Sequence, residues 1–221
     1  MNRRKTCFNI LVLSVVFSLA AAIPQQIFAQ VEKGIELYNT GEYRDAERVL
    51  REALKADPRN ISANYYLGLS ILLQEKHRDA LDILLKVKDD QSKAEQGSRS
   101  PIPNEYQIQI ALARTRLGLQ QYVEAWKNLE AARIEDASSS EVYVYRGVYY
   151  LQQEKHQEAI EELEKAITLN AKNPYAFYYV GLAYFRSGNG EKAIEALKTF
   201  LNLAPYAPEA SEAKSIIDAL C

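Results

Sequence analysis

Four sets of residues recur along this chain with one shared spacing. The alanines of one set are 34, 45, 34 and 34 residues apart, and the other three sets keep the same steps. The alanine register is Ala46, Ala80, Ala125, Ala159 and Ala193. The other registers are Gly34, Gly68, Ala113, Gly147, Gly181; Leu50, Leu84, Leu129, Leu163, Leu197; and Tyr43, His77, Tyr122, His156, Gly190. A fixed period of this length indicates stacked structural repeats, so it constrains the fold before any local pattern does.

Each repeat has the pattern of two helices. Segments 65–73 and 176–185 carry apolar residues at three- and four-residue steps, which is typical of a helix. Gly or a polar residue suits a helix end near positions 41, 75, 120, 154 and 188. The second helix repeats Ala-x-x-x-Leu-x-x-Ala, as in Ala159, Leu163 and Ala166, on one face. Small residues at the contact let two helices approach closely, and the leucines fill the volume beside them.

These residues resemble the tetratricopeptide repeat (TPR) family. Positions that follow its pattern well are Phe177, Gly181, Tyr184, Ala193, Leu197 and Pro205. The third repeat departs most, with Ala113 for Gly and Arg116 where Tyr is usual. The resemblance implies an all-α fold, a right-handed superhelical solenoid of antiparallel helix pairs, whose first helices line a concave groove.

The repeat spacing also predicts the organisation of the chain. We expect a signal peptide, five repeats, an insertion loop after the second, and a capping helix. The expected signal peptide is 1–29, and the expected repeats are 30–58, 59–92, 104–137, 138–172 and 173–206. The expected insertion loop is 93–103, and the expected capping helix is 207–221. The loop composition extends over 89–103 and fits either a surface insertion without a role or a hinge or lid between a two-repeat and a three-repeat block.

The first thirty residues have the pattern of an export signal. Arg3, Arg4 and Lys5 precede 16 uncharged residues that begin at Phe8. We expect cleavage after Ala29, with Ala22 as the alternative, and a periplasmic or secreted protein. An uncleaved signal would instead anchor the chain in the membrane.

The composition excludes several functional classes. Cleavage after Ala29 would leave 24 basic and 29 acidic residues, a net charge of −5, which disfavours nucleic-acid binding. His77 and His156 occupy the same register of different repeats and cannot share a metal, so we expect packing roles for them. No nucleophile has a paired base, and we expect no cofactor, no metal and no enzymatic activity. Cys221 would be the only cysteine that remains. It would either be a terminal thiol without a role or link two chains as a homodimer.

The candidate binding residues lie on the first helices. We call each member of the register Gly34, Gly68, Ala113, Gly147 and Gly181 a central glycine, although one of them is alanine. We expect the residues three positions before, one position after and four positions after each central glycine to face the groove. Tyr175 is expected beside the last of these sets. The predicted groove residues are Ile35, Tyr38, Tyr65, Leu69, Leu72, Ile110, Arg114, Val144, Val148, Tyr175, Tyr178, Leu182 and Phe185, with Val31, Leu117 and Leu151 in the same registers. About half are expected to pack between repeats, leaving Tyr38, Tyr65, Tyr175 and Tyr178 exposed as contact residues.

Together these features favour a non-enzymatic scaffold that binds a protein partner, as a peptide or a helix, in its groove. By resemblance, exported members often serve cell-envelope assembly or secretion. The Lys and Asn clamp of chaperone-binding members is absent, since Val31, Ile35, Gln107 and Ala111 stand at its positions. The alternative is a self-assembling structural component of the envelope.

Overall fold

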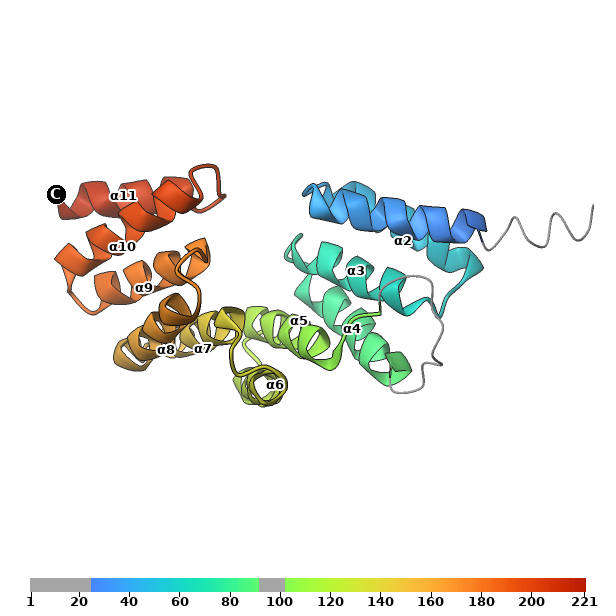
Figure 1. Ribbon diagram of the computed structural model, residues 1–221, viewed down its shortest axis with the longest axis horizontal. Coiled ribbons are helices and arrows are strands. Elements are labelled where there is room, and N and C mark those ends of the chain that lie inside the picture. The colour runs from blue at the N-terminus through green and yellow to red at the C-terminus, as the bar shows by residue number, and fades with distance from the viewer. Residues whose placement is uncertain (1–24, 92–101) are drawn as a thin grey trace, which may run out of the picture. The chain divides into compact units, whose positions relative to one another are not determined.

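The computed structural model describes residues 25–91 and 102–221 and is all-α over these residues (Figure 1). The first helix covers 25–39. The helices that follow are α2 Tyr43–Ala56, α3 Ile61–Leu72, α4 His77–Gln91, α5 Glu105–Gly118, α6 Tyr122–Glu135, α7 Ser140–Gln152, α8 His156–Leu169, α9 Pro174–Arg186, α10 Gly190–Leu203 and α11 Ala210–Leu220. The predicted fold of stacked helix pairs is confirmed.

The chain forms two compact units, which we describe separately. Of the described residues, the first unit comprises 25–91 and 102–104 with the helices up to α4, and the second comprises 105–221 with α5 to α11. Each has its own apolar core. Leu50 and Ile71 belong to the core of the first unit, whereas Leu129, Leu163 and Leu197 belong to cores of the second.

The central glycines explain the close pairing of helices within a repeat. A Cβ atom on Gly147 would lie 2.4 Å from Cγ of Leu163, and one on Gly181 would lie 2.7 Å from Cγ of Leu197. The same clash would occur between Gly34 and Leu50 at 2.5 Å. The glycine and leucine registers of the sequence are therefore the two sides of one contact, in which the leucine fills the space that a side chain would take.

The turns between paired helices also share one backbone conformation. All five positions expected to end a first helix have positive φ, between 58° and 86°. They are Gly41, Glu75, Gln120, Glu154 and Gly188. A left-handed residue after a helix lets the next amides bond back to its last carbonyls, as Lys155 N does to Tyr150 O at 3.0 Å.

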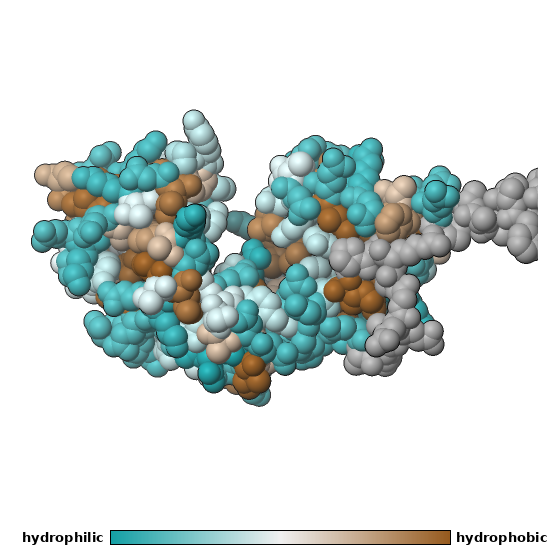
Figure 2. All heavy atoms as spheres, in the orientation of Figure 1, coloured by the Kyte–Doolittle hydropathy of each residue, from teal (hydrophilic) through white to brown (hydrophobic). Residues whose placement is uncertain are grey.

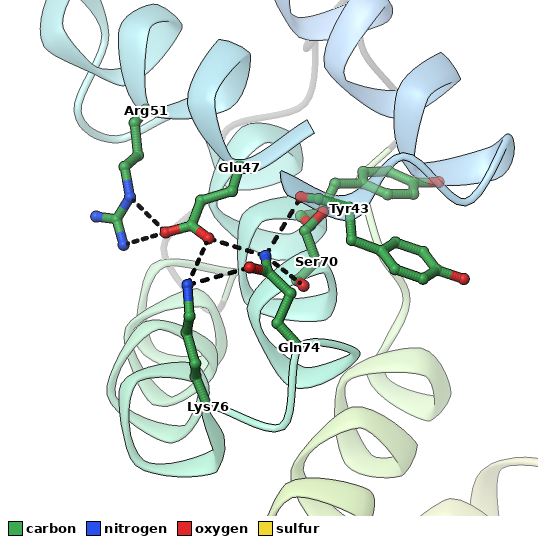
Figure 3. Close-up of polar contacts among 7 residues, drawn as sticks. Tyr43, Glu47, Arg51, Ser70, Gln74 and Lys76 are labelled. Carbon is green, nitrogen blue, oxygen red and sulfur yellow. Dashed lines mark hydrogen bonds and ion pairs between the residues drawn. The ribbon is translucent and has the colours of Figure 1, made fainter. Parts of the chain in front are cut away.

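A polar network joins α2 to the end of α3 in the first unit (Figure 3). Gln74 Nε2 donates to Glu47 Oε2 at 2.8 Å, and Lys76 Nζ donates to the same oxygen at 3.1 Å. Arg51 donates to the other Glu47 oxygen at 2.9 Å. Burial alone would raise the pKa of Glu47, but these hydrogen bonds outweigh it and lower that pKa below its ordinary value.

The third repeat replaces part of its apolar contact with polar side chains. Asn128 on α6 is 4% exposed, and its amide donates to Gln109 on α5, which is 2% exposed. Arg116 reaches across the same pair of helices and donates to the side-chain oxygen of Asn128. Arg116 therefore joins the two helices through Nη1, while its buried Nε has no hydrogen-bond partner among the described residues.

The last helix covers the end of the second unit. α11 packs on α10, and Leu220 would meet a Cβ on Gly190 at 3.3 Å. Its buried side is formed by Ala210 and Ala213, with Ile216 and Ile217 partly buried against the core. This is the half-polar cover that a stacked repeat fold requires at its end.

Two helices extend into segments whose composition indicated a loop or a signal. α4 continues to Gln91, so residues 89–91 are helical although their composition resembles a loop. The first helix, 25–39, crosses the expected cleavage site after Ala29, and Ile27 packs against the first core. Most of the expected signal, residues 1–24, lies outside the described residues. None of the helices within 25–91 and 102–221 is both long and apolar enough to span a membrane.

Candidate functional site

The register three residues before each central glycine faces the protein interior in both units. The exposed fractions are 0% for Val31, 7% for Tyr65, 4% for Ile110, 3% for Val144 and 4% for Tyr178. The expectation that Tyr65 and Tyr178 are exposed contact residues is therefore wrong. These side chains bury apolar surface against neighbouring elements, which stabilises the stack more than leaving them open would.

Tyr178 shows why this register is buried. Its ring lies 5.0 Å from the ring of Phe200 on α10, and its hydroxyl donates to Glu212 on α11 at 2.9 Å. Burial and this hydrogen bond raise its pKa well above the ordinary value. Tyr178 thus joins α9 to α10 and α11. In the first unit, Tyr65 packs edge-on against Tyr66 at 5.4 Å.

The two later registers are mixed. One residue after the glycine, Ile35, Leu69 and Leu182 are at most 9% exposed, whereas Arg114 and Val148 are half-buried. Four residues after it, Leu72, Leu117 and Leu151 are buried, Tyr38 is half-buried, and Phe185 is 39% exposed. Tyr175 is 36% exposed, as expected for a contact residue.

In the second unit the accessible members collect on consecutive first helices. α5 contacts α7, and α7 contacts α9. We call the surface that these helices share the first-helix face, formed by Arg114, Tyr145, Val148, Tyr175, Tyr179 and Phe185. Apolar side chains gather over α9 within a more polar surround (Figure 2).

Specific contacts pre-arrange this face. The guanidinium of Arg114 lies 5.3 Å from the ring centre of Tyr145 on the next first helix. The rings of Tyr175 and Tyr179 are 6.4 Å apart on α9. Burial, followed by the negative charge of Glu209, raises the pKa of Tyr179 to about 12, so this phenol stays neutral at physiological pH.

An acidic margin borders the face at the start of α11. The hydroxyl of Tyr175 donates to Glu209 at 3.3 Å, and Tyr178 donates to Glu212 beside it. Arg114 supplies positive charge on α5, beside the ring of Tyr145. The face therefore combines half-buried aromatic rings with charges of both signs, which suits recognition of an amphipathic protein segment.

Sequence reasoning missed Tyr145 and Tyr179. Both stand two residues before the central glycine, a register that the prediction did not include. The signal was available, because a residue three positions before another lies on the same side of a helix. Tyr145 therefore shares a side with Val148, which was included.

In the first unit, tyrosines form a smaller cluster on the corresponding helices. Tyr38 packs against Tyr66 of α3 at 5.4 Å and against Tyr43 of α2 at 5.9 Å. Tyr38 is thus held by two neighbours, which leaves it less accessible than Tyr175.

The described residues contain no group of three or more His, Cys, Asp or Glu side chains arranged to hold a metal ion. His77 and His156 begin α4 and α8, in different units. The chemistry that the first-helix face offers is contact: burial of aromatic area, cation–π interaction and hydrogen bonds.

Solved structures with the same fold are numerous. TTC0263, a TPR protein of Thermus thermophilus, superposes with a TM-score of 0.71 at 18% identity over 86% of this chain and 98% of its own. MamA from Desulfovibrio magneticus RS-1 superposes with a TM-score of 0.59 at 18% identity, over 82% of this chain and 97% of its own. YrrB, described as a TPR protein with an unusual peptide-binding site, superposes with a TM-score of 0.51 at 21% identity, over 84% of this chain and 90% of its own. At these identities the similarity shows the fold.

No curated protein sequence matches the chain significantly. Family models are more informative. One tetratricopeptide repeat model matches residues 31–95 and 110–174, which together make up more than half of the chain, and a second matches 146–218. The repeats, the glycine–leucine contacts and these matches agree, and the chain belongs to the tetratricopeptide repeat family.

Proposed function

We propose that this protein is an exported, non-enzymatic scaffold that binds a peptide or a helix of a partner protein on the first-helix face of residues 105–221. The TPR fold itself suggests a role in protein–protein interaction. The finer assignment to this face is supported by one observation above all: exposed aromatic side chains, Tyr175 and Phe185, lie on α9 beside the half-buried Tyr179.

Aromatic residues suit this role because they bring much apolar area at low conformational cost. Fully buried neighbours such as Tyr178 hold the helices that display them. A rigid display lowers the entropy lost on binding, so the same contacts yield more affinity. The likeness to YrrB, described by its peptide-binding site, is in keeping with a peptide or helix as the bound form.

Export is supported by the amino-acid sequence. The basic residues at 3–5 and the 16 uncharged residues after them fit a signal peptide, and by resemblance a role in cell-envelope assembly or secretion follows. The packing of Ile27 against the first core favours cleavage after Ala22, which keeps this residue, over cleavage after Ala29, which removes it.

The proposal is tested by crosslinking the protein in its native cells and identifying captured proteins by mass spectrometry. The variant Tyr175→Ala/Phe185→Ala removes the exposed aromatic area of the face. The matched control is Val123→Ala/Ile134→Ala on α6, which removes two apolar side chains that are 64% and 74% exposed and lie on a second helix.

We expect the Tyr175→Ala/Phe185→Ala variant to lose specific partners that the control keeps, while thermal unfolding of both stays close to that of the original protein. Equal capture by both variants would contradict the proposed face. If only further copies of the chain are captured, and sedimentation shows an oligomer at micromolar concentration, a self-assembling structural role replaces the scaffold.

A further inference from the structure

A second surface of residues 105–221 has the form of an open pocket of about 460 Å³. It lies between the second helices α6 and α8, with α7 as its floor. Its lining residues are Trp126, Glu130, Arg133, Tyr143, Arg146, Glu161, Glu162 and Lys165. On α7, Tyr143 and Arg146 point about half a turn away from Tyr145 and Val148, so this pocket is separate from the first-helix face.

The pocket exists because one inner repeat breaks the apolar pattern. The register just before the central glycine or alanine holds Leu67, Leu112 and Val180, each at most 3% exposed, while the first repeat places the exposed Lys33 there. In the fourth repeat, between two others, the same register holds Arg146. A guanidinium cannot fill this space as an apolar side chain does, and it requires charged partners from the flanking helices.

Those partners bond all three guanidinium nitrogens of Arg146. Its Nε and Nη2 donate to Glu162 on α8 at 2.9 and 2.7 Å, and its Nη1 donates to Glu130 on α6. The plane of the guanidinium lies over the ring of Trp126, 4.5 Å from the centroid. A second anion would be repelled by these two carboxylates, so the pocket is a poor anion site despite its arginine.

Of the remaining charged lining, Arg133 pairs with Glu130 at 3.0 Å, which leaves Lys165 and Glu161 at the rim. Lys165 already lies over the ring of Tyr143, with Nζ 4.1 Å from the centroid, which shows that this ring accommodates a cationic group. Glu161 is exposed at the rim and accepts a long hydrogen bond, 3.5 Å, from Gln157. α8 as a whole carries four glutamates against one lysine, and two of them, Glu161 and Glu162, line the pocket.

We propose that this pocket binds a lysine or arginine side chain from a basic segment of a partner protein. The cationic head would pair with Glu161 and the outer oxygens of Glu162, and its stem would pack on the Tyr143 and Trp126 rings, with Lys165 moving aside. The acidic surface of α8 would attract the rest of the basic segment. The pocket would thus give the scaffold a second, charge-selective contact on its second-helix side.

The chain provides its own reporter, because Trp126 is its single tryptophan and lines the pocket. We would titrate the full chain with a tetra-arginine and a tetra-lysine peptide, both acetylated and amidated at their ends, and follow tryptophan emission. A tetra-glutamate peptide with the same ends and inorganic phosphate serve as anionic probes. The basic peptides should give a saturable change that weakens as salt is added, whereas the anionic probes should give none.

The variant Glu161→Gln removes one rim charge from an exposed position. Its matched control is Glu195→Gln, because Glu195 holds the same register in α10, is also exposed and lies outside the pocket. We expect Glu161→Gln to weaken binding of the basic peptides by about two- to fivefold, the range of a solvent-exposed ion pair. Glu195→Gln should leave it nearly unchanged.

Three results would overturn the proposal. One is no saturable response to either basic peptide. Another is equal weakening by Glu161→Gln and Glu195→Gln, which would show attraction to the general negative charge. The third is a response to phosphate or to the tetra-glutamate peptide, which would identify an anion site. Circular dichroism of both variants checks that the helices are intact.

Discussion

The substitution Gly147→Ala tests whether the central glycines set the stability of the repeats. An added Cβ would lie 2.4 Å from Cγ and 2.8 Å from both Cδ atoms of Leu163. Leu163 is fully buried, so it cannot turn out into solvent. Because all three distances are far below van der Waals contact, the overpacking cost lies near the upper end of the usual range, at about 3 kcal/mol.

Helix propensity acts in the opposite direction. Alanine is better than glycine inside a helix by about 1 kcal/mol. The net expectation is a loss of about 2 kcal/mol in the free energy of unfolding, or about 4–8 °C in Tm for a protein of this size. Urea unfolding followed by Trp126 fluorescence measures it, because Trp126 lies in the same unit as Gly147.

The double variant Gly147→Ala/Leu163→Ala identifies the cause. Leu163→Ala alone should cost about 2–5 kcal/mol through the cavity it leaves. The new methyl group at position 147 would partly fill this cavity, so the double variant should lose at least about 1 kcal/mol less than the sum of the single losses. Additive losses, or a Gly147→Ala protein as stable as the original, would refute the packing explanation.

Further predictions concern turns, ion pairs, pH and processing. Glu154→Gly should stabilise the protein by about 0.5–1 kcal/mol in urea unfolding, because Glu154 has φ 59°. Arg146→Leu should destabilise it by roughly 3 kcal/mol, since two half-buried carboxylates lose their partner, and adding Glu130→Gln and Glu162→Gln should recover part of this loss. Burial, followed by the hydrogen bond to a neighbouring carboxylate, raises the pKa of Tyr184 to about 12. Stability should therefore fall from about pH 10 to about pH 12, and Tyr184→Phe should flatten that fall in alkaline unfolding curves. For the proposed export, mass spectrometry of the mature chain should find Ile23 as its first residue, because Ile27 packs against the first core.

Much of the fold was predictable because its determinants repeat locally. The glycine and leucine registers imply a close helix contact, and the structure places them against each other in both units. The helix ends were predictable for a similar reason: Gly41 and Gly188 mark the left-handed turn directly. Glu75, Gln120 and Glu154 could be placed only by alignment with those glycines, since their own propensities do not indicate positive φ.

Exposure on the candidate site was less predictable, because it depends on the neighbouring repeat. Tyr178 and Tyr175 are both tyrosines on one helix, yet they are 4% and 36% exposed. Tyr178 lies closer to Phe200 than Tyr175 does, at 5.0 Å against 6.2 Å, and makes the shorter hydrogen bond to α11, at 2.9 Å against 3.3 Å. Phe200 and Glu212 lie 22 and 34 residues after Tyr178 in the sequence and meet it only once α10 and α11 are packed. A helical wheel of α9 contains neither contact.

The position of Arg146 shows what a single sequence does contain about such contacts. Glu130 lies 16 residues before Arg146 on α6, and Glu162 lies 16 residues after it on α8. Both carboxylates reach Arg146 because α6 and α8 are the second helices on either side of α7. At the same offsets from Val180 in the fifth repeat stand Glu164 and Ala196, so that repeat lacks the paired acids, and an apolar side chain fills its register. A charged residue in an apolar register, with acids at equal distances before and after it, therefore indicates a compensated ionic cluster between second helices and not an error in the repeat alignment. The requirement is physical: a half-buried guanidinium without both carboxylates would destabilise the stack. The three residues must consequently occur together, and the pocket that they line belongs to the fourth repeat in particular.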